Sequence, residues 1–212
     1  MLNTISLRGI LMDDMTTTAA IGGAVTCHGT VAVTRQSGTV DYLPIVLEGR
    51  KLPNLNPFDL MGQRVTITGE VRTFTRNDEE AGHRHKTAVW VESLYKAPAG
   101  VRDDQHVALE GDLCKRPIYR KTPGGREICE LLVACNVGNH SSYIPVIVWG
   151  HNARAMAGAD VGYKVEMTGR FQSRKYEKTL DALGGVKVYR TAYEISAKTC
   201  RVIGYQRKLV AR

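Results

Sequence analysis

Residues 142–149 have the pattern of a strand that begins and ends near an aromatic residue. Successive side chains of an extended strand point to opposite faces, so Tyr143, Ile147 and Trp149 share one face. The opposite face consists of Ile144, Val146 and Val148. A strand of a small barrel fills the core with one face, so we expect the aliphatic side chains to point inward and the rings outward. Exposed rings of this kind form a platform on which nucleobases stack.

Lysine and arginine side chains flank this aromatic strand in two clusters. One cluster precedes the strand in sequence and the other follows it. They comprise Lys115, Arg116, Arg120, Lys121 and Arg126, and then Arg170, Arg174, Lys175 and Lys178. Such side chains contact phosphates and position a nucleic acid without reading its sequence. A run of charges is usually only a solvated face, but two runs that bracket an aromatic strand favour phosphate contact.

The net charge of +8 comes from the second half of the chain. Residues 1–100 contain ten Lys or Arg and ten Asp or Glu, whereas residues 101–212 contain nineteen and eleven, so 19 − 11 = +8. A localised basic excess is typical of a surface that binds a polyanion, although it also occurs on surfaces that serve only solubility.

Other features of the composition argue against several classes of protein. No run of about 18 apolar residues is present, and the first residues lack the pattern of a secretory signal, so we expect a cytoplasmic protein without membrane contact. The five cysteines are widely spaced and include no C-x-x-C pair, which argues against a disulfide framework or a zinc ribbon. We therefore expect no metal and no other cofactor.

Two copies of one pattern run along the chain about 101 residues apart. Residues 42–49 align with residues 143–150, and residues 62–69 align with residues 162–169. Between the copies lies a segment with proline and glycine flanked by charges, which is typical of a linker. The sequence predicts an N-terminal domain at 1–97, a linker at 98–104, a C-terminal domain at 105–203 and a basic tail at 204–212.

Each copy is predicted to be a β-barrel. In the second copy, five segments are rich in Val, Ile, Leu and Tyr and alternate in places: 106–115, 126–137, 142–149, 163–173 and 186–197. An Ala-rich segment at 152–157 predicts a short helix. This order is that of an OB-fold, a barrel that binds oligonucleotides. We predict an all-β chain with two tandem OB-fold five-stranded barrels, each with a short helix between strands 3 and 4; an SH3-like barrel is the alternative.

The motifs of the second copy resemble those of the bacterial and phage single-stranded DNA-binding proteins and the related primosomal replication protein N. The resemblance covers about 90 residues and rests on residues 111–127, 143–150, 169–176 and 193–196. The whole chain looks like the tandem-barrel version of that family. The resemblance implies that the side chains stacking on bases are Tyr143, Trp149 and Tyr176.

The first copy departs from the pattern of the second. Glu48 stands at the position of Trp149, and Arg76 stands at the position of Tyr176. Because this copy also has no net charge, we expect it to be degenerate in binding and to serve dimerisation or packing. Auxiliary contact with DNA is expected from Tyr42, Arg72, Arg76 and Arg84.

Resemblance and charge together predict sequence-independent binding and protection of single-stranded DNA in replication, recombination or repair. We expect a nucleoid-associated homodimer that is not an enzyme, since adjacent carboxylates such as Asp13 and Asp14 point apart and do not converge on a metal. The alternative is an adaptor that recruits a replication or recombination protein to single-stranded DNA. Typical members of the family dock such partners through an acidic tip, which the residues at 207–212 do not provide.

Overall fold

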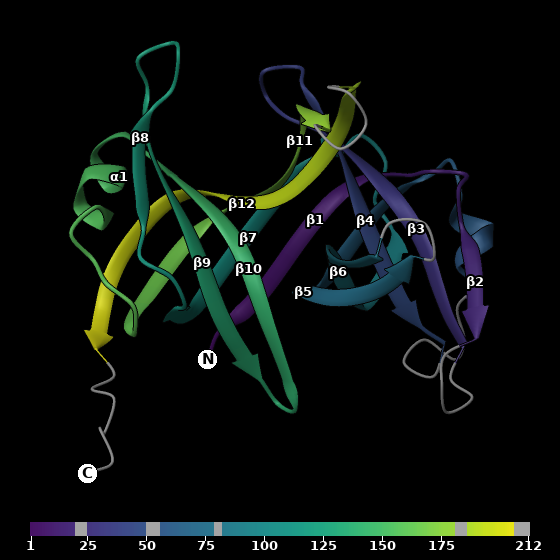
Figure 1. Cartoon of the computed structure of the whole chain (residues 1–212). Helices are drawn as coiled ribbons and strands as arrows, with labels where there is room; N and C mark the ends of the chain where they lie inside the picture. The colour runs from purple at the N-terminus through teal and green to yellow at the C-terminus, as the bar shows by residue number, and fades with distance from the viewer. Residues whose placement is uncertain (20–24, 50–55, 79–81, 181–185, 206–212) are drawn as a thin grey trace.

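The computed structural model describes residues 1–19, 25–49, 56–78, 82–180 and 186–205, and most of them lie in β-strands (Figure 1). The first half contains β1 (Asn3–Leu11), β2 (Thr16–Ala19), β3 (Val25–Thr34), β4 (Val40–Glu48), the 3-10 helix η1 (Pro57–Leu60), β5 (Arg64–Asp78) and β6 (Gly82–Lys96). The second half contains β7 (Asp104–Leu113), β8 (Ile118–Lys121), β9 (Glu127–Val137), β10 (His140–Trp149), the helix α1 (Gly150–Met156), β11 (Tyr163–Leu180) and β12 (Val186–Tyr205). The all-β prediction is confirmed.

Both halves fold with the same connections between strands. In the second half, β7 pairs with β11 at one edge and with β9 at the other, which closes a barrel of five strands. Its strand β10 pairs antiparallel with β9 and parallel with β12. In the first half, β1, β3, β4, β5 and β6 repeat these pairings, again with a parallel pair between β4 and β6. This is the OB-fold in two copies, as predicted, although the helix of the first copy is a 3-10 turn.

The alternation seen in the sequence decides which face of β10 fills the barrel. Ile144, Val146 and Val148 are at most 2% exposed. They join a core with Phe171, which is fully buried on β11. Each such side chain contributes roughly 1.5–3 kcal/mol when it leaves water, so the register of β10 is strongly fixed.

One glycine in each copy marks the place where a strand leaves its barrel. The ladder between β11 and β12 shifts register between Thr168 and Gly169, and the ladder between β5 and β6 shifts at Gly69. A Cβ atom at Gly169 would fall on the carbonyl oxygen of Ser196. Only glycine fits this close approach, so the repeated glycine produces the bulge that bends the strand.

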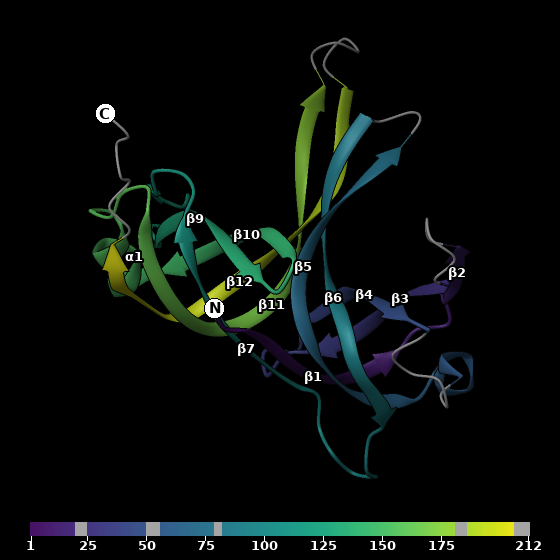
Figure 2. The same ribbon diagram turned by 90° about the horizontal axis from the view of Figure 1, so that it is seen from below.

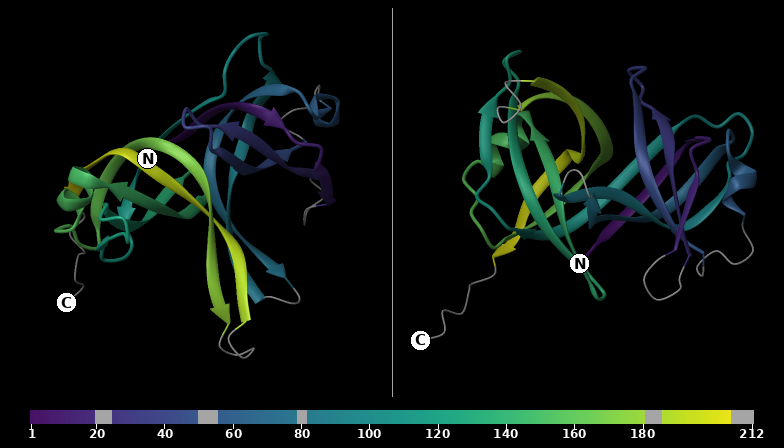
Figure 3. Two further views of the ribbon diagram at one scale, coloured as in Figure 1. Left: turned by 90° about the horizontal axis from the view of Figure 1, so that it is seen from above. Right: turned by 45° about the vertical axis from the view of Figure 1, so that its right-hand side comes forward.

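Beyond these bulges, β5–β6 and β11–β12 continue as two long hairpins that project in the same direction (Figures 2 and 3). The pairing of β11 with β12 runs from Tyr163 opposite Tyr205 to Leu180 opposite Val186. The strands predicted at 163–173 and 186–197 were therefore too short. For β11 the missing part, residues 174–180, lies in the arm, whose polar sequence lacks the alternation of a half-buried strand. For β12 the missing part, residues 198–205, lies in the barrel, where it pairs with residues 163–168 of β11.

The two barrels are joined by an antiparallel ladder between β1 and β7, which lie side by side in the middle of the molecule (Figure 1). Ile5 lies opposite Val107, its counterpart in the repeat, so a pseudo-twofold axis passes through this pair. The axis also relates two further contacts. The backbone N–H of Thr73 donates to the hydroxyl of Ser142, and that of Ser173 donates to the carboxylate of Asp41.

The segment between β6 and β7 is tied to the first barrel. The carboxylate of Asp103 accepts hydrogen bonds from the backbone N–H of Thr34 and from Arg64, at 2.9 and 2.8 Å. Burial alone would raise the pKa of Asp103, but these hydrogen bonds outweigh it and hold the pKa below its usual value. The ionised carboxylate therefore helps to fix how the second barrel leaves the first.

Candidate nucleic-acid interface

Tyr143 lies on the outer face of β10, as its position in the sequence predicts. Its side chain is 53% exposed, while its neighbours Ser142 and Ile144 are buried. Its backbone N–H donates to the hydroxyl of Thr73 in the other barrel, at 2.9 Å. The ring is thus free for contact, and its backbone is held where the two barrels meet.

Trp149 ends β10 and is half-buried. Its indole Nε1 donates to the hydroxyl of Ser196 on β12, at 3.1 Å, which fixes the orientation of the ring. The ring also lines a hollow of about 590 Å³ together with Lys121, Arg126 and Arg154. An oriented ring beside cationic side chains has the chemistry required for stacking on a base whose phosphate is close by.

Tyr176 lies on the projecting part of β11 and is half-buried. The guanidinium carbon of Arg174 lies 5.7 Å from the centre of its ring. Arg174 is also paired with Glu194, a buried carboxylate at 3.1 Å, and this hydrogen bond raises the pKa of the guanidinium. The structure therefore brings Arg174 and Tyr176 together but gives the arginine a partner of its own.

The basic side chains of the first hairpin are exposed around β8. Arg116 is paired with Asp160, and Arg120 with Glu130. Exposed ion pairs are worth only about 0–1 kcal/mol, so either arginine can exchange its carboxylate for a phosphate at little cost. Other predicted cations of this interface are exposed and form no ion pair within the described ranges: Lys115, Lys121, Arg126 and Lys175. The side chain of Lys178 lies outside the described residues.

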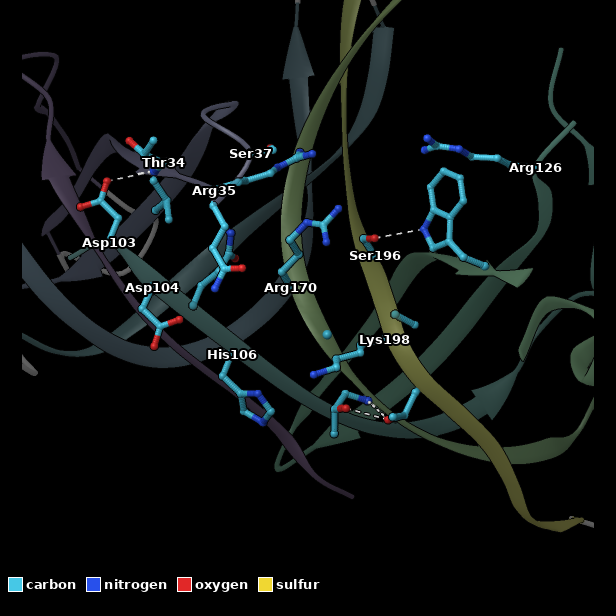
Figure 4. A pocket seen from close by; sticks show the side chains of 18 residues that line it. Thr34, Arg35, Ser37, Asp103, Asp104, His106, Arg126, Arg170, Ser196 and Lys198 are labelled. Carbon is cyan, nitrogen blue, oxygen red and sulfur yellow. Dashed lines mark hydrogen bonds between the residues drawn. The ribbon is translucent and has the colours of Figure 1, made fainter. Parts of the chain in front are cut away.

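Arg170 lies on β11 at the start of its arm, and its environment differs from that of the other cations. One nitrogen of its guanidinium, Nη2, donates to Gln172 at 3.1 Å, while Nε is buried without a hydrogen-bond partner. In the described part of the chain, no carboxylate forms an ion pair with it. Burial, together with the nearby charge of Arg35, lowers its pKa. Figure 4 shows Arg170 between Arg35 and Ser196, at the centre of the surface where the barrels meet.

Trp90 lies on β6 of the first barrel and was not among the residues predicted from the sequence. Its indole Nε1 donates to the carboxylate of Glu48 at 2.9 Å. Glu48 is the counterpart of Trp149, and Trp90 is the counterpart of Ser196, so the same hydrogen bond occurs with donor and acceptor strands exchanged. Each barrel therefore has one indole in this pair of positions, on β10 in the second barrel and on β6 in the first.

Other side chains extend this second aromatic site. The guanidinium of Arg72 lies 5.2 Å from the centre of the Trp90 ring, and Phe74 contacts that ring edge to face at 6.4 Å. Tyr42, the counterpart of Tyr143, is 51% exposed. The predicted auxiliary residues Arg76 and Arg84 face each other in the ladder, but their side chains lie outside the described residues.

The buried cysteines are poor nucleophiles. Burial raises the pKa of Cys129 and Cys135 to about 11 and that of Cys200 to about 12, so these thiols are protonated at neutral pH. Within the described ranges, no group of three or more His, Cys, Asp or Glu side chains is placed to hold a metal ion. Across the same ranges, the helices are too short or too polar to span a bilayer.

Fold and surface together define a protein with two OB-folds and an aromatic, cationic outer face. Residues 104–203 match the model of the single-strand binding protein family. Among curated proteins, no sequence matches the chain.

Solved structures share the fold over the whole chain. The wild-type single-stranded DNA binding protein from Thermus aquaticus is similar with a TM-score of 0.74 and 19% identity, over 99% of this chain and 97% of that chain. A deletion mutant of the same protein gives a TM-score of 0.73, also at 19% identity, over 99% of this chain and 98% of that one. At this identity the likeness shows the arrangement of the two barrels alone.

Proposed function

We propose that this protein binds single-stranded DNA without sequence preference and without catalysis, through the outer faces of its two barrels. The observation that carries the proposal is Trp149, a half-buried indole oriented by Ser196 and surrounded by the side chains of Arg126 and Arg154. Every base has an aromatic face, so stacking contributes about 1–3 kcal/mol per base whatever the sequence. The family model that the C-terminal half matches supports the same conclusion.

Three aromatic side chains of the second barrel stack on bases in this proposal: Tyr143, Trp149 and Tyr176. The cations around them contact the sugar–phosphate backbone, and these are Lys115, Arg116, Arg120, Lys121, Arg126, Arg170, Arg174, Lys175 and Lys178. Binding of this kind neutralises phosphates and releases counterions, so it weakens as salt rises. Coating and protecting single strands in replication, recombination or repair is the cellular role that such binding serves.

The domain boundaries belong to this proposal: a binding barrel at 105–203, and a first barrel at 1–97 that contributes less. Trp90 and Arg72 support an auxiliary contact of the first barrel. Substituting each tryptophan in the full chain tests whether the second barrel contributes more to binding than the first. Trp149→Ala is expected to weaken binding more than Trp90→Ala, and the reverse order would assign the main site to the first barrel.

We further propose a homodimer. The β1 and β7 edges are already paired within the chain, and the outermost strands of the sheet are β2 and β8. A second copy would therefore add to one of these outer strands. Sedimentation equilibrium at micromolar concentration tests this: a mass near 23.4 kDa would refute it, and twice that mass would support it.

A titration followed by tryptophan fluorescence tests the binding function. Oligo-dT is expected to quench the protein strongly, duplex DNA weakly, and higher salt is expected to weaken both. Because the chain has two tryptophans, Trp90→Phe and Trp149→Phe assign the signal. Tyr176→Ala should weaken binding without changing the assigned ring. A wild-type protein that does not bind oligo-dT at low salt would end the proposal.

A further inference from the structure

A cavity of about 920 Å³ lies where the two barrels meet (Figure 4). One wall is the loop after β3 of the first barrel, and the others come from the start of β7 and from β11 and β12 of the second barrel. Trp149 borders it at one end. The cationic side chains that line it are Arg35, Arg126, Arg170 and Lys198.

Arg170 and Gln105 both line this cavity, and each has one buried donor without an acceptor in the free protein: Nε of Arg170 and Nε2 of Gln105. The amide of Gln105 is oriented, because its Oε1 accepts a hydrogen bond from the backbone N–H of Phe171 at 3.0 Å. Buried donors in proteins are almost always satisfied, since each unsatisfied one costs about 1–3 kcal/mol. Two such side chains on one cavity wall favour a ligand that supplies an acceptor when they turn toward it, and the guanidinium favours an anionic acceptor.

The acidic side chains of the cavity do not fill that role. Asp103 is bound to Arg64 and to the backbone of Thr34. The side chain of Asp104 is 75% exposed and lies 3.8 Å from Arg8. Arg35 is neutralised by two hydrogen bonds to Asp41. Among the described residues, neither Arg170 nor Lys198 forms an ion pair, although the charge of Asp41 acts on Arg170 from beside Arg35.

The pseudo-twofold axis provides an internal comparison. The positions equivalent to Arg170, Lys198 and Trp149 hold Glu70, Glu92 and Glu48 in the first barrel. These positions therefore carry two cations and an indole in the second barrel and three carboxylates in the first, where Glu70 pairs with Arg72 and Glu48 accepts from Trp90. General solubility would not separate the charges in this way, whereas an anionic ligand that crosses the junction on one side only explains the difference.

We propose that this cavity holds the phosphodiester backbone of the single strand as it passes from the second barrel to the first, with Arg170 and Gln105 binding one phosphate and Lys198 an adjacent one. This inference rests on the proposed function. It adds Gln105 and Lys198 to the contacts proposed above, and it gives the strand a direction: from the Trp149 ring, through the cavity, toward the β3–β4 loop of the first barrel.

The test compares two double variants of the full chain that each remove two positive charges. Arg170→Gln with Lys198→Gln alters the cavity, whereas Arg201→Gln with Lys96→Gln alters exposed sites elsewhere. The cavity variant is expected to bind oligo-dT about tenfold more weakly at low salt, and to reduce the slope of log K against log salt by about 1.4, because each lost phosphate contact contributes about 0.7. The control should change the affinity less than threefold and leave the slope unchanged.

Gln105→Glu separates a ligand role from a structural one. The carboxylate keeps the acceptor for the N–H of Phe171 and places a negative charge in the cavity of Arg170. The free protein should be as stable as wild type or more so in thermal unfolding, while its affinity for oligo-dT falls about tenfold. Unchanged affinity in this variant, or a cavity variant that behaves like its control, overturns the inference. Since wild type would still bind in those cases, failure of the inference differs from failure of the proposed function.

Discussion

Replacing Trp149 by alanine removes one ring from the face that we propose stacks on bases. A stacked base is worth about 1–3 kcal/mol, which corresponds to a roughly 5- to 150-fold increase in Kd. The upper part of this range is expected, because the hydrogen bond of 3.1 Å to Ser196 holds the indole in place before binding. Ser196→Ala keeps the ring but removes this anchor, so its effect should stay below about tenfold, in line with a hydrogen bond of roughly 0.5–1.5 kcal/mol.

The assay is fluorescence anisotropy of labelled oligo-dT, which does not depend on the emission of the protein. Trp149→Phe is the matched variant, since it keeps a ring and loses the N–H. The expected order of affinity is wild type, then Ser196→Ala and Trp149→Phe, then Trp149→Ala, all with similar unfolding temperatures. If Trp149→Phe were as weak as Trp149→Ala, the ring would act through its N–H and the stacking argument would be refuted.

Three further predictions concern the fold. Gly169→Ala should destabilise the protein by at least about 1–3 kcal/mol in denaturant unfolding, because the new methyl group collides with the carbonyl of Ser196; stability equal to wild type would contradict the bulge. Because the pKa of Asp103 is lower in the folded protein than the unfolded pKa of 3.8, its ionisation stabilises the fold above pH 3.8, and this stability is lost as the pH falls through the folded pKa. Asp103→Asn should therefore flatten the acid end of a stability–pH curve. An unchanged curve would count against the hydrogen bond to Arg64. Cys114, which is only half-buried, should react first with a thiol reagent in the native protein, whereas simultaneous reaction of all five cysteines would indicate a loose core.

The sequence was sufficient for the features that depend on local periodicity or on the repeat. The alternation around Tyr143 predicted the buried face of β10 and the exposure of Tyr143, although Ile147 on the predicted outer face is buried, and the repeated segments predicted two barrels of one fold. The projecting arms were missed because a two-stranded ladder outside a core leaves no apolar pattern. This applies to β11, which continues to Leu180; the missed end of β12 at Tyr205 lies in the barrel, opposite Tyr163.

Pairing between distant residues was out of reach of the sequence. Trp90 was overlooked because its counterpart in the repeat is a serine, and only the parallel pairing of β4 with β6 brings it to Glu48. Similarly, a list of basic residues does not reveal that Arg174 already has a buried carboxylate partner while Arg170 has none. Whether a cation is available to a ligand depends on such long-range contacts.

The ladder between β1 and β7 makes the relationship of the two barrels an intramolecular one. A pair of identical single barrels would separate on dilution, and any substitution in it would appear twice. Here the geometry persists at any concentration, and each half can change alone. The two halves now differ at equivalent positions, with Glu48 in place of Trp149 and Glu70 in place of Arg170. A symmetric pair of identical barrels could never acquire such differences.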